Sequence, residues 1–114
     1  MRSGRPRWVP RRVVQSDHYG PMTEAELRAK VVDLAHDLGW RVFSLPIAKT
    51  RRPVKDASGY PDLTMARLGR KVFIELKAED GVLSQAQMQW KLALGNDHHV
   101  VRPSDVGGLM DLLA

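Results

Sequence analysis

Cysteine is absent from this chain of 114 residues. Without a thiol, the chain has no disulfide, thiolate nucleophile, Fe–S cluster or cysteine-ligated zinc site. Long apolar runs are missing as well, because no stretch approaches the roughly 18 to 20 apolar residues of a membrane-spanning helix. The arginines near the start of the sequence are not followed by the apolar segment of a signal peptide. These absences predict a soluble, cytoplasmic protein without a membrane partner.

The composition is that of a single folded domain. Hydrophobic residues make up 43% and charged residues 27% of the chain, which is typical of globular proteins, and the length suffices for one core. The net charge of +5 is unevenly distributed, because residues 1–22 hold five arginines against one acid, Asp17, and so supply +4 of it. We therefore expect a basic N-terminal arm over residues 1–21 and one domain over residues 22–114.

Cap residues mark a helix at the start of this domain. Thr23 is a suitable N-cap, Glu26 stands three residues later as its capping-box partner, and Gly39 ends the helical spacing of apolar residues. Alternating apolar residues and turn signals predict the remaining elements. In order, we expect a helix over 23–38, strands over 40–45, 62–67 and 71–78, a helix over 84–94, a strand over 98–102, and a helix from 104 onward.

The two later helices also have recognisable caps. Ser84 is expected to cap the first of them, with Met88, Leu92 and the region of Trp90 on its apolar side. Ser104 is expected to cap the last helix. Trp90 is expected to lie in the core or at an interface.

The strand over 71–78 combines an apolar face with a charged one. Side chains alternate along a strand, so Glu75 and Lys77 share one face while Ile74 and Leu76 share the other. A short antiparallel hairpin brings the start of the preceding strand near the end of this one. Asp62 should therefore lie close to Glu75 and Lys77.

Two converging carboxylates repel each other unless a cation lies between them, and oxygen ligands favour hard ions such as Mg²⁺ or Mn²⁺. Such an ion can lower the pKa of water and offset charge that develops on a phosphodiester. The alternative is an ordinary exposed strand face whose Glu75 and Lys77 form an ion pair worth less than about 1 kcal/mol.

The motifs around these residues resemble those of the PD-(D/E)xK nuclease superfamily, and specifically the small stand-alone VRR-NUC nucleases of phages and bacteria. The matching segments are Gly39-Trp40, Gly59-Tyr60-Pro61-Asp62-Leu63, Glu75-Leu76-Lys77, Gly81-Val82-Leu83-Ser84, Gln87 with Trp90, and Arg102-Pro103-Ser104-Asp105. The resemblance covers residues 22–114. It implies an α/β fold with a restriction-endonuclease-like core, in which helices flank a mixed four-stranded sheet in the order α-β-β-β-α-β-α.

The resemblance also implies roles for individual residues. Asp62 and Glu75 would ligate Mg²⁺ or Mn²⁺, the Leu76 carbonyl would complete the ligand set, and Lys77 would serve the attacking water. Gln87 matches a glutamine that supports the lysine or the water in these nucleases. A polar residue that merely begins an amphipathic helix is an equally good interpretation of Gln87.

A glutamate of the first helix usually joins such a site, and the chain offers two. Glu24 falls on the inward stripe of the helix, whereas Glu26 aligns with Lys30 and the aspartates of the solvated face. We therefore assign Glu24 to the site as a catalytic residue and metal ligand, and Glu26 to the cap. Where the family often has glutamine, this chain has Arg28, which we assign to a phosphate contact.

A basic loop precedes the Asp62 motif and is placed to hold a phosphate backbone beside the site. Together with Arg28, its bases are the expected nucleic-acid-binding residues: Lys49, Arg51, Arg52 and Lys55.

The sequence thus predicts a Mg²⁺- or Mn²⁺-dependent nuclease that acts on DNA, as an endonuclease selective for branched, flap or junction structures. By resemblance it would serve DNA repair or recombination in the cytoplasm of a bacterium or of a phage-infected host. A homodimer is expected from the small size of the domain. Two alternatives stay open: a non-catalytic nucleic-acid-binding module, and a nuclease subunit that depends on a helicase or another replication or recombination partner.

Overall fold

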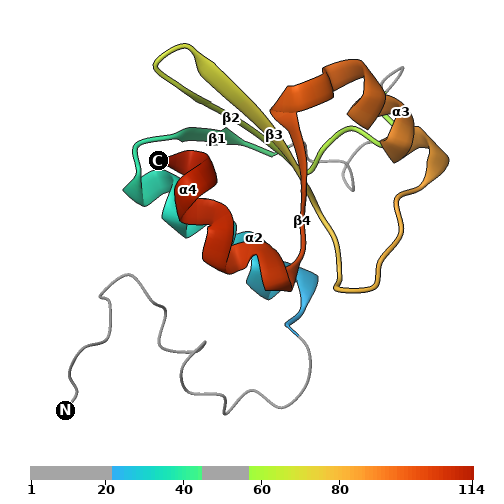
Figure 1. Cartoon of the computed structure of the whole chain (residues 1–114), viewed down its shortest axis with the longest axis horizontal. Coiled ribbons are helices and arrows are strands. Elements are labelled where there is room, and N and C mark those ends of the chain that lie inside the picture. The colour runs from blue at the N-terminus through green and yellow to red at the C-terminus, as the bar shows by residue number, and fades with distance from the viewer. Residues whose placement is uncertain (1–21, 45–56) are drawn as a thin grey trace.

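The computed structural model describes residues 22–44 and 57–114. Figure 1 shows an α/β arrangement of one sheet and three helices, and its labels are used below. The elements are α2 (Glu24–Asp37), β1 (Arg41–Phe43), β2 (Leu63–Arg67), β3 (Arg70–Leu76), α3 (Gln85–Leu94), β4 (His98–Val101) and α4 (Leu109–Leu113), with 3-10 helices at Gly95–Asp97 and Pro103–Gly108. The predicted order of elements is confirmed.

The sheet is mixed, as expected from the sequence. Its four strands lie in the order β1-β2-β3-β4, with antiparallel pairing of β1 with β2 and of β2 with β3, and parallel pairing of β3 with β4. Leu63 pairs with Ile74 at one end of the hairpin, and Arg67 pairs with Arg70 at the other. This register places the start of β2 beside the end of β3.

The hairpin turn is formed by Leu68 and Gly69, which both have positive φ angles, 52° and 85°. A two-residue turn with two positive φ angles matches the right-handed twist of the strands it joins. A single glycine at the second position suffices to mark this turn in the sequence.

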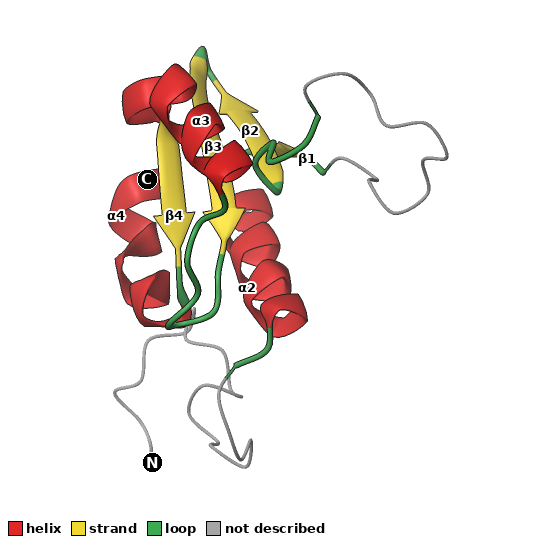
Figure 2. Cartoon of the chain, turned by 90° about the vertical axis from the view of Figure 1, so that its right-hand side faces the viewer, coloured by secondary structure: helices red, strands yellow, loops and turns green. Residues whose placement is uncertain are grey.

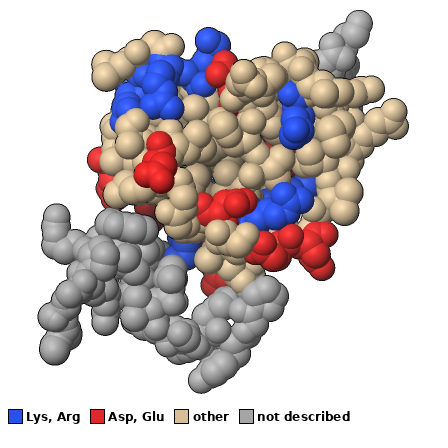
Figure 3. Space-filling model, in the orientation of Figure 1, with Lys and Arg blue, Asp and Glu red and all other residues tan. Residues whose placement is uncertain are grey.

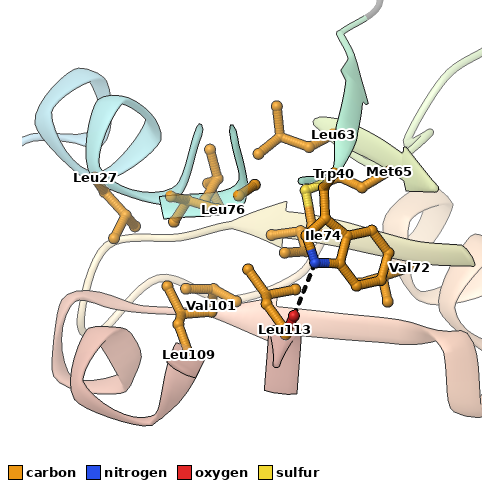
Figure 4. Close-up of a cluster of buried hydrophobic side chains, with 12 residues drawn as sticks. Leu27, Trp40, Leu63, Met65, Val72, Ile74, Leu76, Val101, Leu109 and Leu113 are labelled. Atoms are coloured by element: carbon orange, nitrogen blue, oxygen red, sulfur yellow. Dashed lines mark hydrogen bonds between the residues drawn. The ribbon is translucent and has the colours of Figure 1, made fainter. Parts of the chain in front are cut away.

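The apolar face of β3 lies at the centre of the core. Val72, Ile74 and Leu76 are buried there against the inward residues of α2 and α4. Figure 4 shows these side chains converging from the sheet and from both helices. In Figure 2, α2 and α4 lie on one side of the sheet and α3 lies on the other. The expected alternation of the strand therefore separates a core face from a face on the α3 side, where the Tyr60 ring contacts Phe73 edge-on.

Trp40 ties the C-terminal helix to the rest of the core. Its indole nitrogen donates a hydrogen bond to the Leu113 carbonyl over 2.9 Å, drawn as a dashed line in Figure 4. The guanidinium carbons of Arg67 and Arg70 lie 4.9 and 5.1 Å from the indole centroid. Trp40 is 3% exposed and belongs to the core.

The caps of α2 are those predicted. Thr23 and Glu26 form a reciprocal capping box, in which the Thr23 amide donates to Glu26 Oε1 and the Glu26 amide donates to Thr23 Oγ1. Gly39 follows the helix with a φ of 90°, the left-handed conformation that glycine adopts without strain. Lys30 is a correction, because it is 6% exposed rather than solvated. A long aliphatic stem lets a lysine of a helix flank be covered.

Two expectations for the later helices are wrong. Met88 and Leu92 do not pack against the domain, since their side chains are 42% and 74% exposed, whereas Trp90, expected on the same side, is half-buried. Ser104 does not cap the last helix. That segment begins as a 3-10 helix at Pro103, and the Ser104 hydroxyl donates to Glu79, a stronger acceptor because it is charged.

Within the described ranges, none of the helices has the length and apolar content that crossing a membrane requires.

Candidate active site

Asp62 lies at the start of β2, directly after the buried Pro61. Its carboxylate is turned toward the neighbouring strand, where Oδ2 accepts a hydrogen bond of 2.8 Å from the Leu76 amide. The side chain is 19% exposed. The hairpin therefore delivers Asp62 to the end of β3, as the sequence predicts.

Glu75 stands beside Asp62 and is 2% exposed. Burial raises the pKa of Glu75 from 4.5 to about 8, and the neighbouring carboxyl group of Asp62 adds to the rise; Lys77 opposes it and Glu24 adds to it. Near neutral pH the Glu75 side chain thus retains a proton. Perturbed carboxyl pairs of this kind are typical of functional sites.

Helix α3 supplies a neutral hydrogen-bond partner for Glu75. Gln87 donates from Nε2 to Glu75 Oε2 over 2.9 Å, while its own Oε1 accepts from the Ser84 amide over 2.8 Å. Ser84 returns the capping bond by accepting from the Gln87 amide. The interpretation of Gln87 as a polar residue that begins an amphipathic helix is confirmed by its place in the cap. Its side chain also contacts Glu75 rather than Lys77, and its support of the lysine or of a water stays a prediction.

Gly59 lets the chain before Asp62 lie directly on α3. Its φ is 78°, and a Cβ at this position would lie only 2.4 Å from the carbonyl carbon of Ala86 and 2.6 Å from the Gln87 amide nitrogen. No larger residue fits this approach without displacing the helix. Gly59 consequently fixes the distance between α3 and the strands that carry the carboxylates.

Lys77 follows β3 and is half-buried. Its amide donates to the Val101 carbonyl over 3.1 Å, which extends the pairing of β3 with β4 by one bond. Its ammonium group lowers the pKa of Glu75, so the two side chains lie on the same face. Gly81 backs the lysine, because a Cβ there would lie 3.3 Å from Lys77 Cδ.

The loop after Lys77 is held by Arg102. This arginine donates to the carbonyls of Glu79 and Gly81, over 3.2 and 2.6 Å. Glu79 in turn accepts from both the amide and the hydroxyl of Ser104. These bonds connect the loop that backs Lys77 to the end of β4.

Arg28 reaches the carboxyl pair from α2. One of its nitrogens, NH2, lies 3.7 Å from Asp62 Oδ1, and the other, NH1, donates to Ser44 Oγ over 2.9 Å. The chain thus supplies a cation of its own next to Asp62.

The two glutamates of α2 are placed differently from each other. Glu24 acts on Glu75 through its charge, whereas Glu26 closes the capping box. Glu24 is exposed, which corrects its assignment to the inward stripe. It is the first residue of the helix and lies at the rim of the core.

Some oxygens of the carboxyl pair are candidate ligands for a divalent cation. Glu75 Oε1 is buried and has no hydrogen-bond partner among the described residues, while Lys77 acts on Glu75 and Arg28 lies 3.7 Å from Asp62 Oδ1. Asp62, Glu75 and the main-chain carbonyl of Leu76 are the groups that would hold the ion. No cluster of three or more His, Asp or Glu side chains that could hold a metal occurs among residues 22–44 and 57–114.

Most of the predicted site residues lie close together, whereas the bases of the loop before the motif are outside the described residues. Asp62, Glu75, Lys77 and Gln87 converge, with Arg28 beside them. The bases of the loop before the motif lie outside the described residues: Lys49, Arg51, Arg52 and Lys55. Figure 3 shows acidic and basic side chains intermixed over the described part of one face, consistent with a nearly neutral domain.

Two residues that help to position the site were not predicted from the sequence. Gly59 and Arg102 both lie in segments that carry the resemblance, yet neither was assigned a role. A glycine four residues before a strand is consistent with a positive φ or a close approach, but only the folded chain shows that the approach is to α3.

Comparison of the chain with protein-family models, with curated proteins and with solved structures found no match.

Proposed function

We propose that this protein is a divalent-metal-dependent nuclease that hydrolyses phosphodiester bonds of DNA, with a restriction-endonuclease-like core similar to that of VRR-NUC nucleases. The observation that carries the proposal is the Asp62 and Glu75 pair. One carboxyl is buried with a strongly raised pKa, an oxygen of it has no partner, and a lysine shares its face. A surface ion pair would have neither a buried carboxyl group with a raised pKa nor a buried oxygen without a partner.

A Mg²⁺ or Mn²⁺ ion, when bound, supplies Lewis-acid activation of water and neutralisation of the phosphate. Asp62 and Glu75 would hold the ion, and the Leu76 carbonyl would be the third ligand. Gln87 holds Glu75 Oε2 and leaves Oε1 for the ion. The Leu76 amide holds Asp62 Oδ2 in the same way and leaves Oδ1.

Lys77 acts on the reacting groups directly. Its ammonium is kept on the Glu75 face by the strand and by the loop that Arg102 secures. From there Lys77 Nζ orients the attacking water or donates to the phosphoryl oxygen on which negative charge accumulates. Glu24 adds negative charge at the rim, which strengthens the affinity of the site for a cation.

The substrate we favour is branched, flap or junction DNA, cut internally. The small domain offers little surface for reading a base sequence, and its described face lacks a large single-sign patch. Contacts to the phosphate backbone are assigned to Arg28 and to the basic loop before the motif. The cytoplasm of bacteria, a homodimer and a helicase or recombination partner belong to the same proposal by resemblance.

A cleavage panel tests the proposal. Wild-type protein with Mg²⁺ or Mn²⁺ should cut at least one of plasmid, flap, splayed or four-way DNA, and EDTA should abolish cutting. Lys77→Ala and Glu75→Gln should each lower the rate at least about a hundredfold. The matched control is Lys71→Ala, which removes an exposed base from the same strand and should retain activity.

Equal cleavage by wild type, Lys77→Ala and Glu75→Gln would mean that the activity belongs to a contaminant. DNA binding without cleavage on any of these substrates would favour the non-catalytic module instead.

A further inference from the structure

Arg28 is held between two oxygen-bearing side chains. Its NH2 group lies 3.7 Å from Asp62 Oδ1 and its NH1 group donates to Ser44 Oγ. The Arg28 side chain is 38% exposed, against 19% for Asp62. The guanidinium therefore has one side in the site and one side in solvent.

The oxygens of the carboxyl pair divide into two kinds. Asp62 Oδ2 and Glu75 Oε2 are held by the neutral Leu76 amide and Gln87 amide group. Glu75 Oε1 has no partner within the described ranges, and Asp62 Oδ1 faces Arg28. The two oxygens left for a cation are thus Oε1 and Oδ1, so Arg28 lies next to an oxygen that the cation needs.

We infer that Arg28 is a built-in counter-cation of Asp62 that a divalent ion displaces and that the phosphate of the substrate then engages. This inference rests on the proposed function. An arginine stays charged at any physiological pH, so it opposes a second cation at the same carboxylate. Once displaced, its fork of donors is suited to two phosphate oxygens. The Arg28 side chain is 38% exposed, so its movement away from Asp62 is toward solvent.

The inference predicts effects of opposite sign for one substitution. Removing the charge in Arg28→Gln should tighten metal binding, because a repulsive neighbour is lost, and should weaken DNA binding, because a phosphate donor is lost. A residue with only a structural role would weaken both, since loosening the site disturbs the ligands and the DNA surface together.

Metal affinity is measured on the full chain with Mn²⁺ alone, by the paramagnetic resonance signal of the free ion. We expect the Kd of Arg28→Gln for Mn²⁺ to fall about tenfold, and that of Arg28→Lys, which keeps the charge, to stay within about twofold of wild type. Arg41→Gln is the matched control. It removes one exposed positive charge from β1, forms no ion pair with Asp62 or Glu75, and should change the Kd less than twofold.

DNA affinity is measured by fluorescence anisotropy with a labelled four-way junction in Ca²⁺ as the metal. The Kd of Arg28→Gln should rise at least about fivefold, and the slope of log Kd against log salt concentration should decrease by about one. Arg28→Lys should recover part of this loss. Circular dichroism and urea unfolding of each variant report whether the fold is retained.

The outcomes separate the two proposals. If wild type binds Mn²⁺ no better than Glu75→Gln, the metal site and the inference both fail. If wild type binds Mn²⁺ but Arg28→Gln binds it equally or more weakly, the inference alone is overturned. Unchanged DNA affinity in Arg28→Gln overturns the phosphate contact.

Discussion

Replacing Glu75 by glutamine should stabilise the metal-free protein at alkaline pH and leave its stability nearly unchanged in acid. Burial and the neighbouring Asp62 raise the pKa of Glu75 from 4.5 to about 8. Between these pH values the folded state keeps the proton while the unfolded chain releases it. The free energy of unfolding of wild type therefore falls as the pH rises from about 4.5 to about 8, and no further loss from this group follows above that.

Glutamine reproduces the protonated acid. Its carbonyl can accept the hydrogen bond from Gln87, and its uncharged amide group avoids the desolvation cost of a buried carboxylate. Each pKa unit corresponds to about 1.4 kcal/mol. Allowing for relaxation of the site, we expect Glu75→Gln to be more stable than wild type by about 2 to 4 kcal/mol at pH 8, and by less than about 0.5 kcal/mol at pH 4.5.

Urea unfolding followed by tryptophan fluorescence in EDTA, over this pH range, measures the difference. Asp33→Asn removes an exposed acid of α2 and should follow wild type at every pH. Mg²⁺ at pH 8 should then raise the urea midpoint of wild type but not that of Glu75→Gln. A stability difference that is the same at pH 4.5 and pH 8, or a variant that is less stable at pH 8, would refute the reasoning.

Two further predictions concern positions around the pair. Glu24→Gln should lower the rate of DNA cleavage at least about tenfold, because the charge that acts on Glu75 is lost. Glu26→Gln keeps an oxygen for the cap, so its rate should stay within about twofold of wild type. If a single-turnover assay gave the reverse order, the placement of α2 would be contradicted. Gly59→Ala should cost about 2 to 3 kcal/mol of stability and weaken Mn²⁺ binding through displacement of α3. The control is Gly69→Ala, a position with a similar φ of 85° but open space around it. Urea unfolding should show that this variant also loses stability, and Mn²⁺ titration should show that it keeps its metal affinity. Equal metal affinity in both variants would show that the approach to α3 does not position Gln87.

The fold was predictable where local chemistry decides it. The capping box of Thr23 and Glu26 depends on residues three apart, and the hairpin turn depends on Leu68 and Gly69 alone. The carboxyl pair was predictable for a related reason. A short hairpin fixes which residues of two strands are neighbours, so the position of Asp62 relative to Glu75 follows from counting.

What could not be predicted depends on contacts between distant segments. Helical spacing shows that Met88 and Leu92 share a side of α3, but it does not show whether anything packs against that side. Ser104 does not form the expected cap because its hydroxyl donates to the charged side chain of Glu79, on a loop about twenty-five residues earlier. The ion pair of Arg28 with Asp62 likewise requires the angle between α2 and the sheet, which no local pattern specifies.

The hydrogen bond from the Leu76 amide to Asp62 has a consequence for how the sheet ends. Main-chain pairing of β2 with β3 reaches Leu63 and Ile74, and beyond it a side chain takes over as acceptor. The carboxylate thus terminates the ladder in place of another strand, and the last amide of β3 is shielded only while that carboxylate stays in position. The hydrogen-exchange rate of the Leu76 amide should therefore increase whenever the Asp62 carboxylate moves away from it.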